Sequence, residues 1–280
     1  MEKAIKRYFP IFVLPTMIAF TLGFIIPFVE GVYLSFCKFT TVNDAKFIGF
    51  ANYAKVFADE TFVHAFWYTA AFTVVSVILI NVLAFAVALL LTKGFKGTNI
   101  FRPVFFMPNL IGGIVLGYIW QLLLNGILMK FSRTLTYSST YGFWGLIILM
   151  CWQQIGYMMI IYIAGIQNIP GELIEAAEID GATKWQILKK VTIPMVMPSI
   201  TVCTFLTLTN SFKLFDQNLA LTNGEPSKMS EMLALNIFNT FYGRTGYEGV
   251  GQAKAVIFFI LVTVIALTQN YLTRRKEVQQ

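Results

Sequence analysis

The sequence predicts an all-α, polytopic membrane protein with six transmembrane helices. Hydrophobic residues make up 57% of the 280 residues and charged residues only 12%, whereas soluble domains carry about 25% charged residues. Apolar runs of about 20 residues, the length of helix that crosses a bilayer, recur along the chain. Lys and Arg lie in small groups between these runs, as in the loops of membrane proteins. Together these observations indicate the fold class.

Six apolar runs are the expected spans, and the first of them needs to be distinguished from a signal peptide. In order, the spans are 9–36, 66–92, 101–128, 142–167, 195–220 and 250–272. Basic residues at positions 3, 6 and 7 precede an apolar run from Tyr8 to about Val29, which resembles the front of a signal peptide. The run is too long for one, and no small-x-small cleavage site follows it. We therefore expect it to remain in the membrane.

Aromatic residues support the limits of several spans. Trp67, Tyr68, Trp120, Tyr141 and Trp144 are expected near span ends. Amphipathic rings concentrate at the headgroup level of a bilayer. We interpret these five side chains as interfacial anchors.

The third and fifth spans contain residues that are unusual in a membrane helix. Pro108-Asn109 and Gly112-Gly113 predict a break in the third span, and irregular backbone at membrane depth usually lines a cavity. Lys213 and Asp216 stand three residues apart in the fifth span. Because charges are costly at a helix centre, they would either pair there or lie near the outer end of the span, and we favour the outer end. The sixth span, 250–272, ends before a basic tail.

The distribution of Lys and Arg predicts the orientation of the chain, because cytoplasmic loops are enriched in both. With the N-terminus inside, the cytoplasmic segments hold Lys3, Lys6, Arg7, Lys93, Lys96, Arg102, Lys184, Lys189, Lys190, Arg274, Arg275 and Lys276. The opposite side holds fewer, spread over longer loops. Both termini and the segment 168–194 are therefore predicted to be cytoplasmic.

Several classes of function lack their signature in this sequence. The net charge of +7 is not concentrated on one basic face, so nucleic-acid binding is not indicated. Cys37, Cys151 and Cys203 show no metal-ligand or redox spacing, and His64 is the only histidine. A phosphate-binding loop is also absent, because the "GATK" at 181–184 lacks its preceding glycine. We expect no cofactor or metal in this chain and no catalytic residue.

The segment 168–194 is the most polar stretch in the middle of the chain. Pro170, an acidic first turn and the stop signal Asp180-Gly181 predict a helix over about 170–180. A second short helix is expected over 184–191, and Pro194 marks the return to the membrane. Small residues at 176, 177 and 181 would allow another protein to approach closely. A helix lying on the membrane surface is the alternative, but its acids would be repelled by anionic lipid.

The same segment resembles a known family. Glu175-Ala176-Ala177, Gly181 and Ile193-Pro194 have the spacing of the EAA loop in permease subunits of binding-protein-dependent ABC importers. "FIGFANYAKVF" (47–57) and "FRPVFFMPNL" (101–110) are similar to segments of permeases of the maltose and glycerol-phosphate type. The resemblance covers nearly the whole chain and implies the type I ABC importer permease architecture. It divides the chain into a tail, first helix and external loop (1–65), a permease core with the coupling loop 168–194 (66–272), and a cytoplasmic tail (273–280).

The resemblance also implies partners and roles for residues. In the family, the EAA loop docks on an ATPase subunit, which assigns coupling to Glu175, Ala176, Ala177, Asp180, Gly181 and Pro194. ATP and Mg²⁺ would then be bound by two partner ATPase subunits. A second permease subunit and an external solute-binding protein complete the expected importer in the prokaryotic cell membrane.

Polar side chains within the spans are the candidates for the substrate path, because unpaired polar groups are costly there. Gln154 and Tyr157 share one face of the fourth span, whereas Gln153 is expected to point elsewhere. Amides and a phenol suit a neutral, hydroxyl-rich cargo such as a sugar. In the permeases that this chain resembles, the sugar path is lined at the positions of Asn109, Gln154, Tyr157, Thr207 and Ser211; Asn210 lies beside them.

Three alternatives remain open at this point. Thr204, Thr207 and Ser211 form a hydroxyl stripe, but hydroxyls in membrane helices often bond to their own i−4 carbonyls. An ion-coupled secondary sugar carrier would need intramembrane acids and internal repeats. A membrane enzyme acting on lipids would need paired carboxylates or clustered histidines. An ABC importer permease for a carbohydrate, either an oligo- or a monosaccharide, fits the sequence best.

Overall fold

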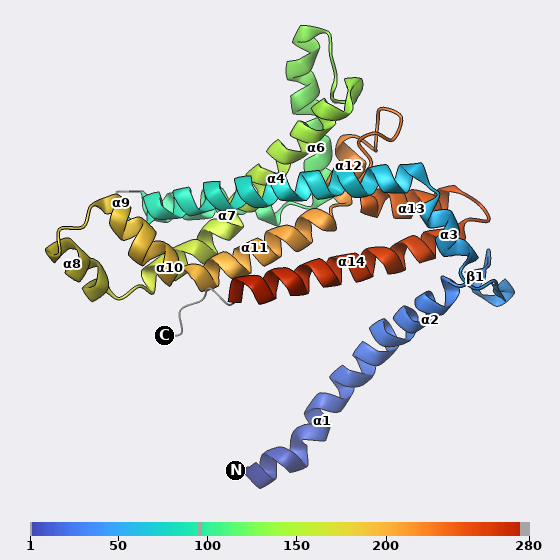
Figure 1. The fold of residues 1–280 in the computed structure, drawn as a ribbon, viewed down its shortest axis with the longest axis horizontal. Helices are drawn as coiled ribbons and strands as arrows, with labels where there is room; N and C mark the ends of the chain where they lie inside the picture. The colour runs from blue at the N-terminus through green and yellow to red at the C-terminus, as the bar shows by residue number, and fades with distance from the viewer. Residues whose placement is uncertain (1, 95–96, 275–280) are drawn as a thin grey trace. The chain divides into compact units, whose positions relative to one another are not determined.

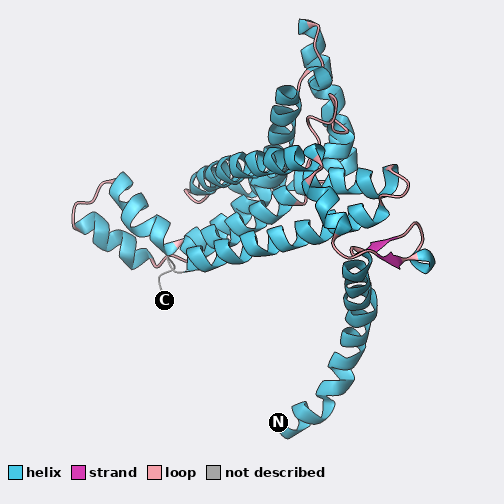
Figure 2. Cartoon of the chain, turned by 45° about the vertical axis from the view of Figure 1, so that its right-hand side comes forward, coloured by secondary structure: helices cyan, strands magenta, loops and turns pink. Residues whose placement is uncertain are grey.

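A computed structural model describes residues 2–94 and 97–274 of the chain. The described residues are mainly helical, with one pair of short strands (Figures 1 and 2). The longer helices are α1 (Glu2–Phe20), α2 (Ile26–Leu34), α4 (Glu60–Leu91), α5 (Thr98–Phe106), α6 (Gly113–Leu128), α7 (Ser139–Gln167), α8 (Gly171–Ile179), α11 (Met197–Phe212), α13 (Leu233–Gly243) and α14 (Glu248–Arg274). The shorter ones are α3 (Ala51–Phe57), α9 (Lys184–Ile187), α10 (Ile193–Met195) and α12 (Asp216–Leu221).

Tight or wide helical turns join several of these elements. The 3₁₀ turns are η2 (Val42–Asp44), η3 (Met107–Leu110), η4 (Met129–Phe131) and η5 (Leu135–Tyr137), and the π turns are η1 (Thr21–Ile25) and η6 (Leu188–Thr192). The strands β1 (Cys37–Lys38) and β2 (Lys46–Phe47) pair antiparallel, with Cys37 opposite Phe47.

The predicted spans agree with the structure where the apolar run is uninterrupted. Five helices in the described part are long and apolar enough to cross a membrane: Ile11–Leu34, Glu60–Leu91, Gly113–Phe131, Ser139–Gln167 and Glu248–Thr273. A sixth is present if Lys184–Met195 and Met197–Phe212, which meet at a bend of 69°, form one broken span. The membrane fold class is confirmed.

Two of the predicted spans are not continuous helices, one as predicted and one against the prediction. The third, 101–128, is interrupted as expected at Pro108 and Gly112, where η3 and an extended residue separate α5 from α6. The fifth, 195–220, ends early: α11 stops at Phe212, and the separate helix α12 follows after Lys213. Proline removes a backbone donor at the first break, whereas the second has no proline or glycine signal.

The chain forms two compact units, Met1–Glu60 with Ile237–Ile260, and Thr61–Asn236 with Leu261–Gln280. In the first unit, Lys254 is fully buried and donates to the carboxylate of Asp59 at 2.8 Å and to the hydroxyl of Thr240 at 2.8 Å. Asn52 donates to the carbonyls of Ser35 and Cys37 at 2.9 and 2.8 Å. These polar contacts hold α3, α13 and the start of α14 together.

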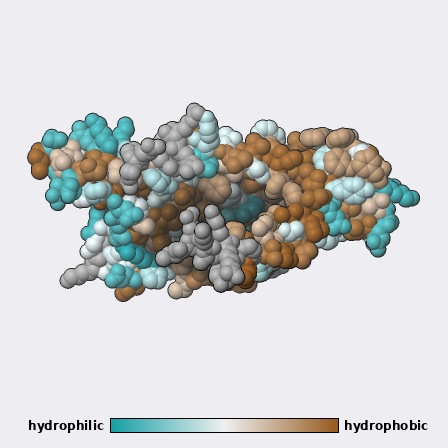
Figure 3. Space-filling model, turned by 90° about the horizontal axis from the view of Figure 1, so that it is seen from below, coloured by the Kyte–Doolittle hydropathy of each residue, from teal (hydrophilic) through white to brown (hydrophobic). Residues whose placement is uncertain are grey.

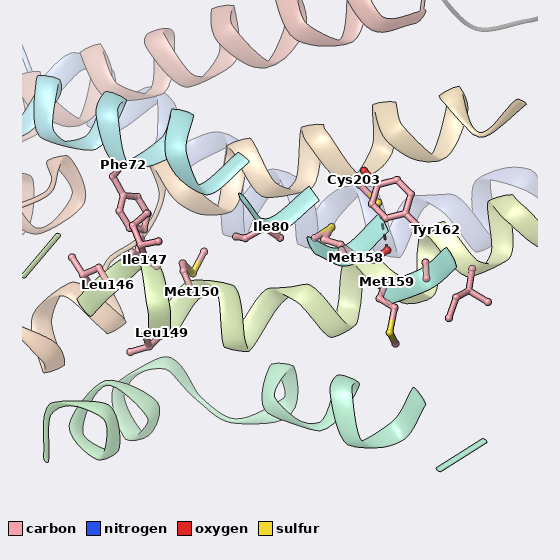
Figure 4. Packing of buried hydrophobic residues seen from close by; sticks show 14 of the residues in the cluster. Phe72, Ile80, Leu146, Ile147, Leu149, Met150, Met158, Met159, Tyr162 and Cys203 are labelled. Atoms are coloured by element: carbon pink, nitrogen blue, oxygen red, sulfur yellow. Dashed lines mark hydrogen bonds between the residues drawn. The ribbon is translucent and has the colours of Figure 1, made fainter. Parts of the chain in front are cut away.

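The core of the second unit lies between α4, α7 and α11. Residues of α4 at intervals of four, from Phe72 through Ile80 and Ala84 to Ala88, are fully buried, as expected for one face of a helix. They pack with buried residues of α7 such as Met158 and Tyr162 (Figure 4). Small residues in this stripe allow helix backbones to approach closely in a membrane protein.

Candidate functional site

A polar cavity lies where the broken third span meets α7, α11 and α12. Its volume is about 460 Å³, within the range of about 300–1,000 Å³ typical of ligand sites. Its lining is Asn109, Met150, Gln153, Gln154, Asn210, Lys213, Leu214, Phe215, Asp216 and Gln217. The lining combines residues from both chain breaks, so the interruptions at 107–112 and 213–215 build the site.

A close approach between α5 and α7 fixes one side of this region. Gly156 on α7 is buried, and a Cβ atom at this position would overlap the carbonyl oxygen of Phe105 on α5. Only glycine leaves room for that backbone. The sequence therefore places α5 against α7 two residues after Gln154.

Gln153 is held by hydrogen bonds across the cavity region. Its Oε1 accepts a hydrogen bond from Nε2 of Gln217 at 2.8 Å, and its Nε2 donates to the carbonyl oxygen of Ile111 at 3.3 Å. Gln153 thus connects α7 with α12 and with the break before α6. The expectation that Gln153 points away from the site is wrong, because Gln153 lines the cavity together with Gln154.

Gln154 contrasts with its neighbour. Its side chain is only 8% exposed, and Oε1 has no hydrogen-bond partner. A buried acceptor without a partner costs about 1–3 kcal/mol. Gln154 lines the cavity, although Oε1 itself is buried. A hydroxyl donor in the cavity would satisfy the acceptor once the amide turns toward it.

The rim of the cavity carries one charge of each sign. Lys213 caps the C-terminus of α11 and Asp216 begins α12, and both are exposed in this chain. Their position at the end of α11 agrees with the expectation from the sequence. An ion pair between the two is not among those found in the described residues.

The other predicted path residues lie elsewhere. Tyr157, Thr207 and Ser211 are not in the cavity lining. Thr207 Oγ1 donates to the carbonyl of Cys203 at 2.8 Å and accepts from Asn81 Nδ2 at 3.3 Å. The Asn81 Oδ1 accepts from the hydroxyl of Tyr162 at 2.7 Å. This network joins α4, α7 and α11. The bond from Thr207 to the Cys203 carbonyl is the i−4 bond that the sequence left open as an alternative to a cargo contact.

The segment after α7 forms the second candidate site, and its first helix is defined by local bonds. Pro170 precedes α8, and Gly181 ends it with a φ of +75°. The amide of Ala182 donates to Ala177 O at 2.9 Å, and that of Gly181 donates to Glu178 O at 3.0 Å. This is a Schellman motif, in which glycine supplies the left-handed residue. The predicted helix over 170–180 is confirmed.

A second set of local bonds begins α9. The amide of Gln186 donates to Thr183 Oγ1 at 3.3 Å, and the amide of Thr183 donates to Gln186 Oε1 at 2.7 Å. The capping box was not predicted, although the sequence Thr183-x-x-Gln186 carries its signature. The helical path continues through η6 to Pro194, so the expected helix over 184–191 is confirmed.

Exposure separates this loop from the rest of the unit. No residue of α8 is buried, and Glu175, Ala176, Asp180 and Gly181 are all exposed. Ile179 and Trp185 are 86% and 70% exposed. Figure 3 shows hydrophilic surface gathered where α8 and α9 lie, with isolated apolar residues in it. The exposure of these two large side chains was not predicted from the sequence.

Residues 80–278 match the family profile described as the inner membrane component of binding-protein-dependent transport systems. The chain belongs to this family. It is 42% identical to the probable starch degradation products transport system permease protein of Thermoanaerobacterium thermosulfurigenes, over 96% of this chain and 94% of that protein. It is 28% identical to the trehalose/maltose transport system permease protein of Thermococcus litoralis, over 89% and 88%.

A solved structure has the same fold. A chain of a bacterial ABC transporter that imports the acidic polysaccharide alginate matches with a TM-score of 0.82, 23% identity and coverage of 98% of both chains. The chain is therefore a multi-pass permease component of a binding-protein-dependent transport system, with the type I importer fold.

Proposed function

We propose that this chain is one of two membrane-spanning subunits of an ATP-driven importer that carries a carbohydrate delivered by an external binding protein. The family match supports the importer class, and the polar cavity lined by Gln154 is the observation that carries the choice of a hydroxyl-rich cargo. The relatives named for starch products and for trehalose or maltose support a carbohydrate as the cargo.

The chemistry of the cavity favours a neutral cargo with many hydroxyl groups. Asn109, Gln154, Asn210 and Gln217 present amides, each of which has donors and acceptors. Lys213 and Asp216 together leave the rim without net charge. Sugar hydroxyls can donate to Gln154 Oε1 and accept from the amide nitrogens, so transfer from water into the cavity exchanges hydrogen bonds instead of losing them.

The geometry connects the cavity to the exposed loop. The loop containing α8 begins where α7 ends and leads through α10 into α11. Both flanking helices also carry lining residues, Gln154 on α7 and Asn210 on α11. A displacement of the loop therefore moves two walls of the cavity, which is the coupling that alternating access needs.

We assign docking on a partner ATPase to Glu175, Ala176, Ala177 and Asp180 of the loop. The exposed acids can pair with basic residues of the partner, and the alanines admit its surface closely. Gly181 and Pro194 would shape the loop instead of contacting the partner. Gly181 ends α8 through its backbone conformation, and nothing lies within 4 Å of its Cβ position. Pro194 lies in α10, where the chain leads back to α11. ATP and Mg²⁺ would be bound by that partner. Both termini would then be cytoplasmic, on the side of the loop.

Reconstitution tests the proposal. The chain should be assembled in proteoliposomes with its second permease, its ATPase and its binding protein, and uptake of labelled malto-oligosaccharides should be measured. ATP inside the vesicles should drive uptake, whereas a proton or sodium gradient alone should not. Uptake driven by a gradient in vesicles without the ATPase would favour a secondary carrier.

A pair of substitutions on α11 tests the role of the cavity in the same assay. Asn210→Leu should reduce uptake about tenfold, the effect of losing one to two hydrogen bonds to cargo. Thr209→Val is the matched control, because Thr209 Oγ1 donates to the Phe205 carbonyl at 2.9 Å and does not line the cavity. Equal uptake by both variants would count against a cargo site at this position.

A further inference from the structure

A second cavity in the same unit is apolar. It has a volume of about 260 Å³ and lies between α6, η5 and the first turns of α7. Its lining is Leu124, Ile127, Leu128, Leu135, Thr140, Tyr141, Trp144, Gly145 and Ile148. Even an apolar cavity of about 150 Å³ stays dry and accepts an apolar guest. This space therefore favours hydrocarbon over water.

Glycine keeps the floor of this cavity open. A Cβ atom at Gly145 would come within 2.7 Å of Leu135 Cδ2 and 3.5 Å of Leu124 Cδ1. The mouth is formed by exposed apolar side chains, since Ile127 and Ile148 are 58% and 45% exposed. A chain-like apolar ligand can enter from outside the protein.

A basic rim adjoins the cavity. Arg133 Nη1 donates to the hydroxyl of Tyr141 at 2.9 Å, and its guanidinium carbon lies 4.6 Å from the centre of the Tyr137 ring. Tyr141 also lines the cavity, so it joins the rim to the apolar space. Arg133 is exposed, and the described ion pairs do not include it. A guanidinium has five donors, which leaves several for an anion. Lys130 is exposed on the same connection.

The position of the rim along α7 matches the headgroup level of a bilayer. Helix α7 has 29 residues and is therefore about 44 Å long at 1.5 Å per residue. A bilayer with its headgroups is about 40–45 Å thick. Arg133 precedes the first residue of α7, whereas α8 follows the last. The rim therefore lies at the membrane surface opposite to the exposed loop.

We propose that this cavity binds an anionic phospholipid, with part of one acyl chain between α6 and α7 and the phosphate on Arg133. The combination of a dry cavity and an adjacent cation at headgroup depth selects this ligand, because guanidinium groups bind phosphate oxygens in a bidentate fashion. A transmembrane helix of the second permease would instead need an apolar stripe along its length and would gain nothing from Arg133. The proposal does not depend on the cargo.

Binding can be measured on the purified, assembled transporter by native mass spectrometry after delipidation. Dioleoyl phosphatidylglycerol and dioleoyl phosphatidylcholine, which share their acyl chains, are the probes. Both lipids carry the phosphate that Arg133 would bind, but phosphatidylcholine also brings a choline cation close to Arg133 and Lys130. Phosphatidylglycerol should therefore bind about tenfold more tightly. Arg133→Gln should remove this preference, and Arg133→Lys should retain part of it.

Two further variants separate the cavity from its rim. Ile148→Trp should block the cavity from its exposed mouth and weaken binding of both lipids. Arg244→Gln is the matched control, because Arg244 also lies over a tyrosine ring, 6.0 Å from the centre of Tyr247, but does not line this cavity. It should bind lipid like the unmodified protein. Thermal unfolding of each variant checks that the fold is retained.

Equal binding of the two lipids by the unmodified transporter would overturn the proposal. So would an unchanged preference in Arg133→Gln. Efficient disulfide cross-linking of Ile148→Cys to a cysteine in the second permease would show instead that protein covers the cavity.

Discussion

The exposed α8–α9 loop and the polar cavity are built in opposite ways. In the loop, hydrogen bonds join residues no more than five positions apart, as in the Schellman motif of α8 and the capping box of α9. Around the cavity they join residues 42 and 64 positions apart, from Gln153 to Ile111 and Gln217. The hydrogen bonds that shape the loop are local, although Ile174 of α8 also packs against the core. The cavity depends on how several helices pack.

This difference explains what each region can do. A locally determined helix with no buried residue can leave its side chains available for a partner. A cavity held by long-range contacts changes shape whenever its helices move, which suits a site that must open to either side of the membrane. The following predictions sharpen or break this comparison, starting with the largest expected effect.

Gly156→Ala should have the largest effect, a loss of stability in the region of the cavity. The added Cβ atom would overlap the Phe105 carbonyl, and overpacking in a core costs about 1–3 kcal/mol or more. Thermal unfolding of the purified transporter should show a clear fall in midpoint. Gly126→Ala is the control, because nothing lies within 4 Å of its Cβ position. If both variants unfold alike, α5 does not pack against α7 as described.

Gly181→Val should act on the loop and not on the core. A branched residue at a φ of +75° costs about 1–2 kcal/mol, so the C-terminal end of α8 should open. We expect weaker association with the ATPase and slower uptake at an unchanged thermal midpoint. Gly181→Asn should have a smaller effect, since asparagine tolerates this conformation. Normal assembly with Gly181→Val would show that the end of α8 plays no part in docking.

Gln154→Leu tests whether the cavity is built for cargo or for stability. Removing a buried acceptor that has no partner should leave the unfolding midpoint unchanged or slightly higher. Uptake should nevertheless fall. Gln217→Leu is the comparison, because it breaks the 2.8 Å bond to Gln153 and should lower stability by about 0.5–1.5 kcal/mol. A loss of stability in Gln154→Leu would indicate a structural role.

The smallest expected effect concerns Asp44, which caps the turn η2 by local hydrogen bonds. Its carboxylate accepts from the amides of Thr40 and Thr41 at 2.9 Å each, which lowers its pKa. The ordering of this turn should be complete above the ordinary pKa of aspartate and be lost as the pH falls through the lowered one. Hydrogen exchange at both amides should therefore gain protection with pH across this range. Asp44→Asn should remove the dependence.

The same contrast decides what the sequence could predict. The helix over 170–180 and its end at Gly181 follow from neighbouring residues, and both were predicted. The break at Pro108 was predicted because proline lacks a backbone donor. The end of α11 at Phe212 was not predicted, because no proline or glycine marks it. The direction of the Gln153 side chain was predicted wrongly for the same reason. Its partner Gln217 lies on α12, which is a separate helix only because α11 ends at Phe212. The docking and cargo roles themselves stay predictions.

A structure of the assembled transporter with a bound malto-oligosaccharide tests the central claim most directly. The account predicts sugar density in the cavity between Asn109, Asn210 and Gln217, with a hydroxyl within hydrogen-bond distance of Gln154 Oε1. Density placed instead beside Thr207 and Ser211, with Gln154 Oε1 still without a partner, would contradict it.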